Sequence, residues 1–129
     1  MKIIMIAGNS NTGKTTVLAR DFQNWLKGQT VKYIEPIKDC GNRDIEGTFQ
    51  INGKNVAVFS RGDYFEEIVK IIVKYAHYDI LIITGNTERV RIKRMVDKIK
   101  KNKNHCVIEK IKRTDPDNTR VLNEIILNM

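Results

Sequence analysis

The stretch MIAGNSNTGKTTVL, residues 5–18, begins with apolar residues, continues through small polar residues and reaches a lysine followed by two threonines. Gly8, Gly13, Lys14 and Thr15 match the pattern G-x-x-x-x-G-K-[ST], which describes a loop that holds phosphate groups. Glycine allows backbone angles that are closed to other residues, and it lets the chain approach a bulky anion closely. The stretch therefore predicts an anion-binding loop between a strand and a helix.

Each part of this loop has an expected role. The backbone N–H groups of residues 9–15 would turn inward as donors, and the dipole of the following helix would add positive potential at the same point. Lys14 would reach the β and γ phosphates of a nucleotide, and the hydroxyl of Thr15 would ligate Mg²⁺. The residues expected to hold the nucleotide are Gly8, Asn9, Ser10, Asn11, Thr12, Gly13, Lys14, Thr15 and Thr16.

The flanking sequence supplies the strand and the helix that such a loop requires. Residues 2–7 (KIIMIA) form a continuous apolar run, which indicates a buried strand. Apolar residues then recur at helical spacing until Gly28: Val17, Leu18, Phe22, Trp25 and Leu26. Over residues 2–27 the sequence resembles the Walker A region of the P-loop NTPase superfamily, and beyond them it is similar in architecture alone. The resemblance implies a domain that binds a nucleoside triphosphate with Mg²⁺.

Length and composition place limits on the class of protein. The chain of 129 residues predicts a single domain, 1–129, and its formal net charge of +8 favours anionic partners such as nucleotides or nucleic acid. It contains no apolar run of transmembrane length and does not begin like a signal peptide, so we expect a cytoplasmic protein without a membrane partner. Cys40 and Cys106 belong to no metal-binding or disulfide spacing pattern, and we expect both to be reduced.

Strand and helix patterns alternate along the rest of the chain. Such alternation predicts an α/β fold, a three-layer P-loop NTPase-like sandwich whose sheet is mostly parallel. Asn52-Gly53 is typical of a type I′ hairpin turn, so the hairpin should add one antiparallel strand at the sheet edge. The remaining expected strands are 30–35, 46–51, 54–60, 79–84 and 106–111, the expected helices are 64–76, 88–100 and one capped by Asp117 or Asn118, and residues 36–43 are expected to form a loop.

Ligands of such sheets bind beyond the carboxyl ends of the strands, which directs attention to the stretch Ser60-Arg61-Gly62-Asp63. A P-loop site needs a second carboxylate for its metal, supplied from a strand beside the first. Ser60 stands where that acid usually ends the strand, so Asp63 becomes the candidate for both metal binding and catalysis. Alternatively, Asp63 caps the helix that follows. Small bacterial and phage P-loop proteins are similar at this stretch.

The other strand ends give weaker signals. Gly85-Asn86-Thr87 could face the nucleotide, but capping of the next helix is the preferred interpretation. The guanine-reading string Asn-Lys-x-Asp of GTP-binding domains does not follow a strand here, so ATP is favoured over GTP. The hairpin is similar to one in GTPases, which keeps GTP as the alternative.

A basic run begins at Arg89 and Arg91 and continues through Lys93, Arg94, Lys98, Lys100, Lys101 and Lys103. It reads as a solvated helix face, as a clamp on a transferred phosphoryl group, or as a nucleic-acid surface. Three functions stay open accordingly. The first is an NTPase, with Lys14 and Asp63 as catalytic residues, whose state signals to a protein partner. The second is a nucleoside or nucleotide kinase using Asp39 or Asp44 in the 35–46 loop as a base, and the third is a nucleotide-gated nucleic-acid binder.

Overall fold

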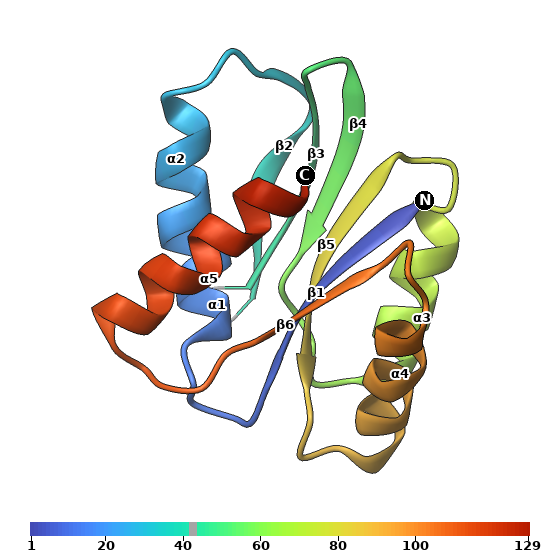
Figure 1. Ribbon diagram of the computed structural model, residues 1–129. Helices are drawn as coiled ribbons and strands as arrows, with labels where there is room; N and C mark the ends of the chain where they lie inside the picture. Colours follow the sequence, from blue (N-terminus) through green and yellow to red (C-terminus); the bar gives the residue numbers. More distant parts are fainter. Residues whose placement is uncertain (42–43) are drawn as a thin grey trace.

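A six-stranded mixed sheet forms the centre of the computed structural model, which describes residues 1–41 and 44–129 (Figure 1). The strands are β1 (Lys2–Gly8), β2 (Lys32–Gly41), β3 (Asp44–Ile51), β4 (Lys54–Phe59), β5 (Ile80–Asn86) and β6 (Cys106–Glu109). Their order across the sheet is β2-β3-β4-β5-β1-β6. β4, β5, β1 and β6 are parallel, whereas β3 is antiparallel to both β2 and β4. The predicted α/β class with a mostly parallel sheet is confirmed.

Helices cover both faces of this sheet, which gives three layers (Figure 1). One face of the sheet packs against the helical segment that follows residues 5–16 and against the C-terminal helix. The other face packs against the two helices that lie between these two segments in the sequence. The helical segments are α1 (Lys14–Thr16), the π-helical η1 (Val17–Phe22), α2 (Gln23–Lys27), α3 (Phe65–Lys74), α4 (Val90–Lys101) and α5 (Asp115–Asn128). No helix within the described ranges is long and apolar enough to cross a membrane.

The alternation of side chains along β1 explains how one strand serves both layers. Ile4 and Ile6 point into the core beneath α2 and α5, and Ile3 and Met5 point into the core beneath α3 and α4. All four are at most 5% exposed. Because successive residues of a strand face opposite sides, a strand buried on both faces must be apolar throughout. This burial fixes the position of the loop that leaves β1.

The hairpin turn forms as predicted, but the edge of the sheet differs from the prediction. Asn52 and Gly53 have φ values of 49° and 75°, as a type I′ turn requires. β2 extends to Gly41 instead of ending near residue 35, with irregular register against β3. Pro36 lacks an N–H, and such a residue is accommodated on an edge strand with bulges. β2 therefore covers β3, so the antiparallel strand is not at the edge, and residues 36–41 are not a loop; residues 42–43 lie outside the described part.

Two predictions about the helices also require correction. In α3, Val69 and Ala76 are exposed, whereas Ile71 and Tyr75 are buried beside Ile68, because the packed face is rotated by about one residue position from the expected one. The cap of α5 is not Asp117 or Asn118. Its N-cap is Thr114, whose Oγ1 accepts a hydrogen bond from the backbone N–H of Asp117 at 3.4 Å. Pro116 suits the first turn, so the helix begins earlier than expected.

Candidate functional site

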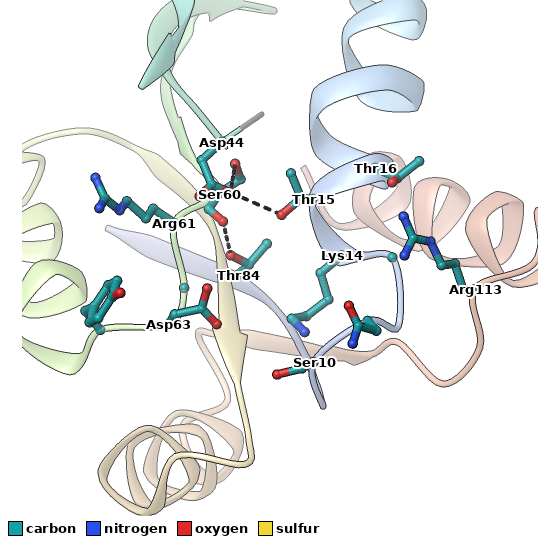
Figure 2. Close-up of a pocket in the computed structure, with 14 residues that line it drawn as sticks. Ser10, Lys14, Thr15, Thr16, Asp44, Ser60, Arg61, Asp63, Thr84 and Arg113 are labelled. Atoms are coloured by element: carbon teal, nitrogen blue, oxygen red, sulfur yellow. Dashed lines mark hydrogen bonds between the residues drawn. The ribbon is translucent and has the colours of Figure 1, made fainter. Parts of the chain in front are cut away.

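A cavity of about 360 Å³ lies where β1, β4 and β5 end and β3 begins (Figure 2). The rule that ligands of parallel sheets bind beyond the carboxyl ends of the strands predicted this location. The loop residues that line the cavity are Ser10, Asn11, Gly13, Lys14, Thr15 and Thr16, and the other lining residues are Asp44, Ser60, Arg61, Gly62, Asp63, Tyr64, Thr84 and Arg113. Gly8, Asn9 and Thr12 instead line a second cavity of about 240 Å³ on the other side of the loop.

The two glycines of the motif are required for different reasons. Gly13 has a φ of 88°, in the left-handed region that favours glycine. Gly8 does not use such a conformation, contrary to expectation; a Cβ there would lie 2.5 Å from the carbonyl oxygen of Lys110. Gly13 is also the N-cap of α1 and offers no capping side chain. The first N–H groups of the helical segment are therefore left without a side-chain acceptor, as an anion-binding loop requires.

The Lys14 ammonium lies within the loop. Its Nζ donates to the carbonyl oxygen of Asn9 at 2.6 Å and contacts Oγ1 of Thr12 at 3.5 Å. Burial lowers the pKa of Lys14, and the nearby carboxylates of Asp63 and Glu88 oppose this effect. Among the described residues, Lys14 forms no salt bridge. The loop therefore holds a cation whose charge is not neutralised by a direct partner.

The carboxylate nearest the Thr15 hydroxyl belongs to Asp44, which sequence reasoning considered only as a base for a kinase. Thr15 Oγ1 donates to Asp44 Oδ1 at 3.2 Å, and Ser60 Oγ donates to the same oxygen at 3.3 Å (Figure 2). Ser60 is 2% exposed and also accepts a hydrogen bond from the backbone N–H of Ile45 at 2.8 Å. Ser60 occupies the position where the metal-binding acid usually ends the strand. Its hydrogen bond holds Asp44, which comes from the neighbouring strand β3, at the site instead.

The pKa of Asp44 is raised above its ordinary value. Burial is the main cause, the nearby carboxylate of Asp63 adds to it, and the hydrogen bonds from Thr15 and Ser60 act in the opposite direction. A carboxylate in this environment is stabilised by an added cation. Carboxylate and hydroxyl oxygens are also the ligands that Mg²⁺ prefers. The residues on this side of the cavity therefore fit a bound Mg²⁺.

Asp63 lines the same cavity, but its contacts differ from both expectations. Its Oδ1 accepts a hydrogen bond from Asn86 Nδ2 at 3.0 Å. The capping alternative is wrong, because α3 has Tyr64 as its N-cap and no side-chain cap hydrogen bond. The strand that leads to Asp63 is also not beside β1, since β5 lies between β4 and β1. A role for Asp63 in metal binding remains a prediction.

The last residue of β5 and the turn after it contact the loop, although capping of the next helix was the preferred interpretation. Asn86 Nδ2 donates to Ser10 Oγ at 2.9 Å, and Thr87 Oγ1 donates to Asn9 Oδ1 at 2.9 Å. The N-cap of α4 is Arg89, without a side-chain cap hydrogen bond. This polar turn is visible in the sequence, where capping was the preferred interpretation, but the position of the strand beside β1 was not predicted.

The cations at the cavity are not those of the basic run. Lys14, Arg61 and Arg113 line it, and Arg113 comes from the segment after β6. In the run, Arg91 pairs with Glu66 at 2.5 Å, and its guanidinium lies 4.1 Å from the centre of the Phe65 ring. Further pairs join Lys93 to Asp97 and Lys100 to Glu109. Arg113 could have been found by applying the strand-end rule to the last strand.

Within the described ranges, no group of three or more His, Cys, Asp or Glu residues could hold a metal ion by itself. A metal at Thr15 and Asp44 would therefore need further oxygen ligands, and nucleotide phosphates or water commonly supply them. Comparisons of the chain with protein-family models, curated proteins and solved structures found no match. The geometry of the cavity and its loop is thus the basis for assigning a function.

Proposed function

We propose that this protein is a small P-loop NTPase that binds Mg²⁺ with a nucleoside triphosphate, ATP in preference to GTP, and hydrolyses it. One arrangement carries the proposal. An ammonium without a carboxylate partner lies in a loop at the start of a helix, and it shares a cavity with a hydroxyl and a carboxylate of raised pKa. Cation, N–H donors and metal ligands are the groups that phosphoryl chemistry needs around one phosphate chain.

Each residue has a distinct part in this proposal. Lys14 and the N–H groups that begin α1 bind the phosphates, and Gly13 allows the loop to approach them. Thr15 and Asp44 hold Mg²⁺, with Asp63 on the same cavity as a further carboxylate. Bound Mg²⁺ supplies neutralisation of the charge that develops on the phosphate oxygens. Arg113 and Arg61 add positive charge at the wall of the cavity.

Calorimetry with ATP and Mg²⁺ tests the proposal directly. The Lys14→Ala variant should lose ATP binding while its fold is retained, because the substitution removes the one ammonium inside the loop. Lys27→Ala, which removes the same charge at the end of α2, is the matched control and should bind as the unchanged protein does. Equal ATP affinities for the Lys14→Ala variant and the unchanged protein would overturn the proposal.

A kinase is the second candidate, and a cavity beside Asp63 favours it. This cavity of about 360 Å³ is lined by Asp63 itself together with Tyr64, Phe65, Glu66, Arg89, Val90 and Arg91. It could hold a phosphoryl acceptor next to the proposed nucleotide site, whereas the loop expected to do so is largely strand. Incubation with γ-labelled ATP and a panel of nucleosides and nucleotides separates the two. Label on inorganic phosphate indicates hydrolysis, and label on an acceptor indicates a kinase.

The third function considered, nucleic-acid binding, gains no support from the basic run. Three of its cations are engaged with Glu66, Asp97 and Glu109. Base-stacking surfaces usually interleave cations with exposed aromatic side chains, and the run contains none. The signalling role of an NTPase is instead consistent with the contacts between the loop and the turn before α4.

A further inference from the structure

One acidic side chain contacts the loop in a way that the proposed function does not use. Glu88 lies in the turn between β5 and α4, and its carboxylate faces Ser10. Oε1 accepts a hydrogen bond from the Ser10 backbone N–H at 3.2 Å, and Oε2 accepts one from Ser10 Oγ at 3.0 Å. A carboxylate that accepts from a backbone N–H of a phosphate-binding loop makes the kind of contact that a phosphate oxygen would make.

The charges around Glu88 are also consistent with its carboxylate taking the place of a phosphate. The carboxylate is close enough to Lys14 to act on its pKa, in the direction that stabilises the ammonium. A nucleotide phosphate near Lys14 would bring more negative charge to the same place, so Glu88 and the phosphate repel one another. The N–H of Ser10 is one of the loop donors expected to bind phosphate, and it donates only one hydrogen. The two anions therefore compete for one donor and one cation.

The turn that carries Glu88 is hydrogen-bonded to the end of β5 and leads directly into α4. The backbone N–H of Glu88 donates to Asn86 Oδ1 at 3.0 Å, while Asn86 Nδ2 donates to Ser10 Oγ and to Asp63 Oδ1. Arg89, the next residue, is the N-cap of α4, and its carbonyl oxygen accepts from Lys93 N at 2.9 Å. Movement of the Glu88 carboxylate away from Ser10 would thus act on the beginning of α4.

We propose that Glu88 is an internal anion that occupies the loop in the nucleotide-free protein and is displaced by the phosphates of the bound nucleotide. This inference rests on the proposed function, because it assumes that phosphates bind at the loop. Displacement of Glu88 releases the turn before α4 and links nucleotide binding to the first turn of that helix. The competition raises the apparent Kd, which equals the intrinsic Kd divided by the fraction of protein in which Ser10 is free of Glu88.

The test compares Glu88→Gln with the unchanged protein in calorimetric titrations with ATP and with inorganic tripolyphosphate. Both contacts with Ser10 are exposed, so we expect a modest gain, about fivefold tighter binding of either probe by the variant. Glu124→Gln on α5, which removes the same charge far from the loop in sequence, should leave affinity unchanged. Titrations at about 0.1 M and about 1 M salt separate direct competition from a long-range field, because only the latter is screened strongly.

A second measurement follows the turn itself. ATP should increase amide hydrogen exchange at residues 88–92 in the unchanged protein, and Glu88→Gln should show the faster exchange before ATP is added. Unchanged or weaker affinity in Glu88→Gln, or a gain that disappears at high salt, would overturn the inference. If Lys14→Ala also binds ATP normally, the proposed function fails; if only the Glu88 results fail, the nucleotide site stands and the internal anion does not.

Discussion

Asp44 is the first residue of β3 and Asp117 lies in the first turn of α5, and the surroundings of the two carboxylates differ sharply. Asp117 accepts hydrogen bonds from Lys110 Nζ at 2.9 Å and from the backbone N–H groups of Ile111 and Lys112 at 3.0 Å, and Arg120 Nε donates to it at 3.0 Å.

The Asp44 carboxylate receives hydroxyl hydrogen bonds at 3.2 and 3.3 Å, from Thr15 and Ser60, and no salt bridge among the described residues. Burial acts to raise the pKa of both carboxyls. At Asp117 the hydrogen bonds from Lys112, Lys110 and Ile111 outweigh burial and hold the pKa well below its ordinary value, whereas at Asp44 the pKa stays raised. A carboxylate whose hydrogen-bond and charge partners are complete stabilises the fold, whereas a carboxylate with incomplete partners is suited to bind a cation.

The largest expected effect is on stability at Asp117. Asp117→Ala leaves the Lys110 ammonium, whose side chain is 0% exposed, without its carboxylate. Breaking a buried ion pair in this way typically costs about 3–5 kcal/mol, so the free energy of unfolding by urea should fall by that order. Asp115→Ala, two residues earlier with a side chain 93% exposed, should change it little. A loss below about 1 kcal/mol in the Asp117→Ala variant would show that Asp117 does not stabilise the fold as a buried ion pair does.

Asp44→Asn should affect Mg²⁺-dependent binding and leave stability intact, the opposite of Asp117→Ala. The fold should remain as stable or become more stable, because the substitution removes a partly buried charge whose burial outweighs the nearby Arg61 and the hydrogen bonds that stabilise it. The affinity for ATP in the presence of Mg²⁺ should fall by about tenfold to a hundredfold, the range typical for weakened metal sites. Calorimetry with and without Mg²⁺ measures this effect. Asp97→Asn on α4 is the control, and unchanged Mg²⁺-dependent affinity in the Asp44→Asn variant would contradict the metal assignment.

Asp63→Asn should have a smaller effect on Mg²⁺-dependent ATP binding than Asp44→Asn. Asp63 contacts Asn86 instead of Thr15, so it would act on the metal less directly than Asp44. Mg²⁺-dependent ATP affinity should fall by less than in Asp44→Asn, while metal-free ADP binding is retained. A greater loss for Asp63→Asn than for Asp44→Asn, measured in the same titration, would reverse the assignment of the two carboxylates.

The smallest expected effect is the pH dependence of stability. Since the folded protein raises the pKa of Asp44, stability from this group is lost as pH rises above the ordinary value of 3.8. Since the folded protein lowers the pKa of Asp117, its contribution is present above 3.8 and is lost as pH falls below that value. Urea unfolding between about pH 3 and pH 7 should therefore show Asp44→Asn gaining, and Asp117→Asn losing, relative to the unchanged protein as pH rises. If the free energy of unfolding varied with pH in the same way in both variants and in the unchanged protein, the directions of both pKa shifts would be contradicted.

The parts of the molecule that sequence predicted are those set by local pattern. The loop between β1 and α1 follows from a fixed spacing of glycines, lysine and threonine, and the turn at Asn52-Gly53 follows from the φ values that it needs. Strand order was not predictable in this way, because it depends on pairing between segments far apart. The insertion of β5 between β1 and β4 is such a case.

The site shows the same limit. Thr15 and Asp44 are 29 residues apart and meet only because β3 pairs with β4 and Ser60 holds the aspartate in place. No local pattern encodes that approach. Asn86 was closer to prediction, since a polar turn after a strand can face a ligand, whereas Glu88 was expected only at the start of a helix. Helix capping, a local explanation, was preferred at Asn86 over the contact with Ser10 that the sheet creates.

A metal-rescue experiment at Asp44 determines whether this side chain is a ligand of the proposed Mg²⁺. Asp44→Cys replaces the proposed oxygen ligand with sulfur, which prefers soft metal ions. Calorimetry should show weak ATP binding by this variant with Mg²⁺ and restored binding with Cd²⁺. The unchanged protein controls for Cys40 and Cys106 and should show no such gain from Cd²⁺. Equal binding of ATP by Asp44→Cys with either metal ion would contradict a metal–nucleotide site at Thr15 and Asp44.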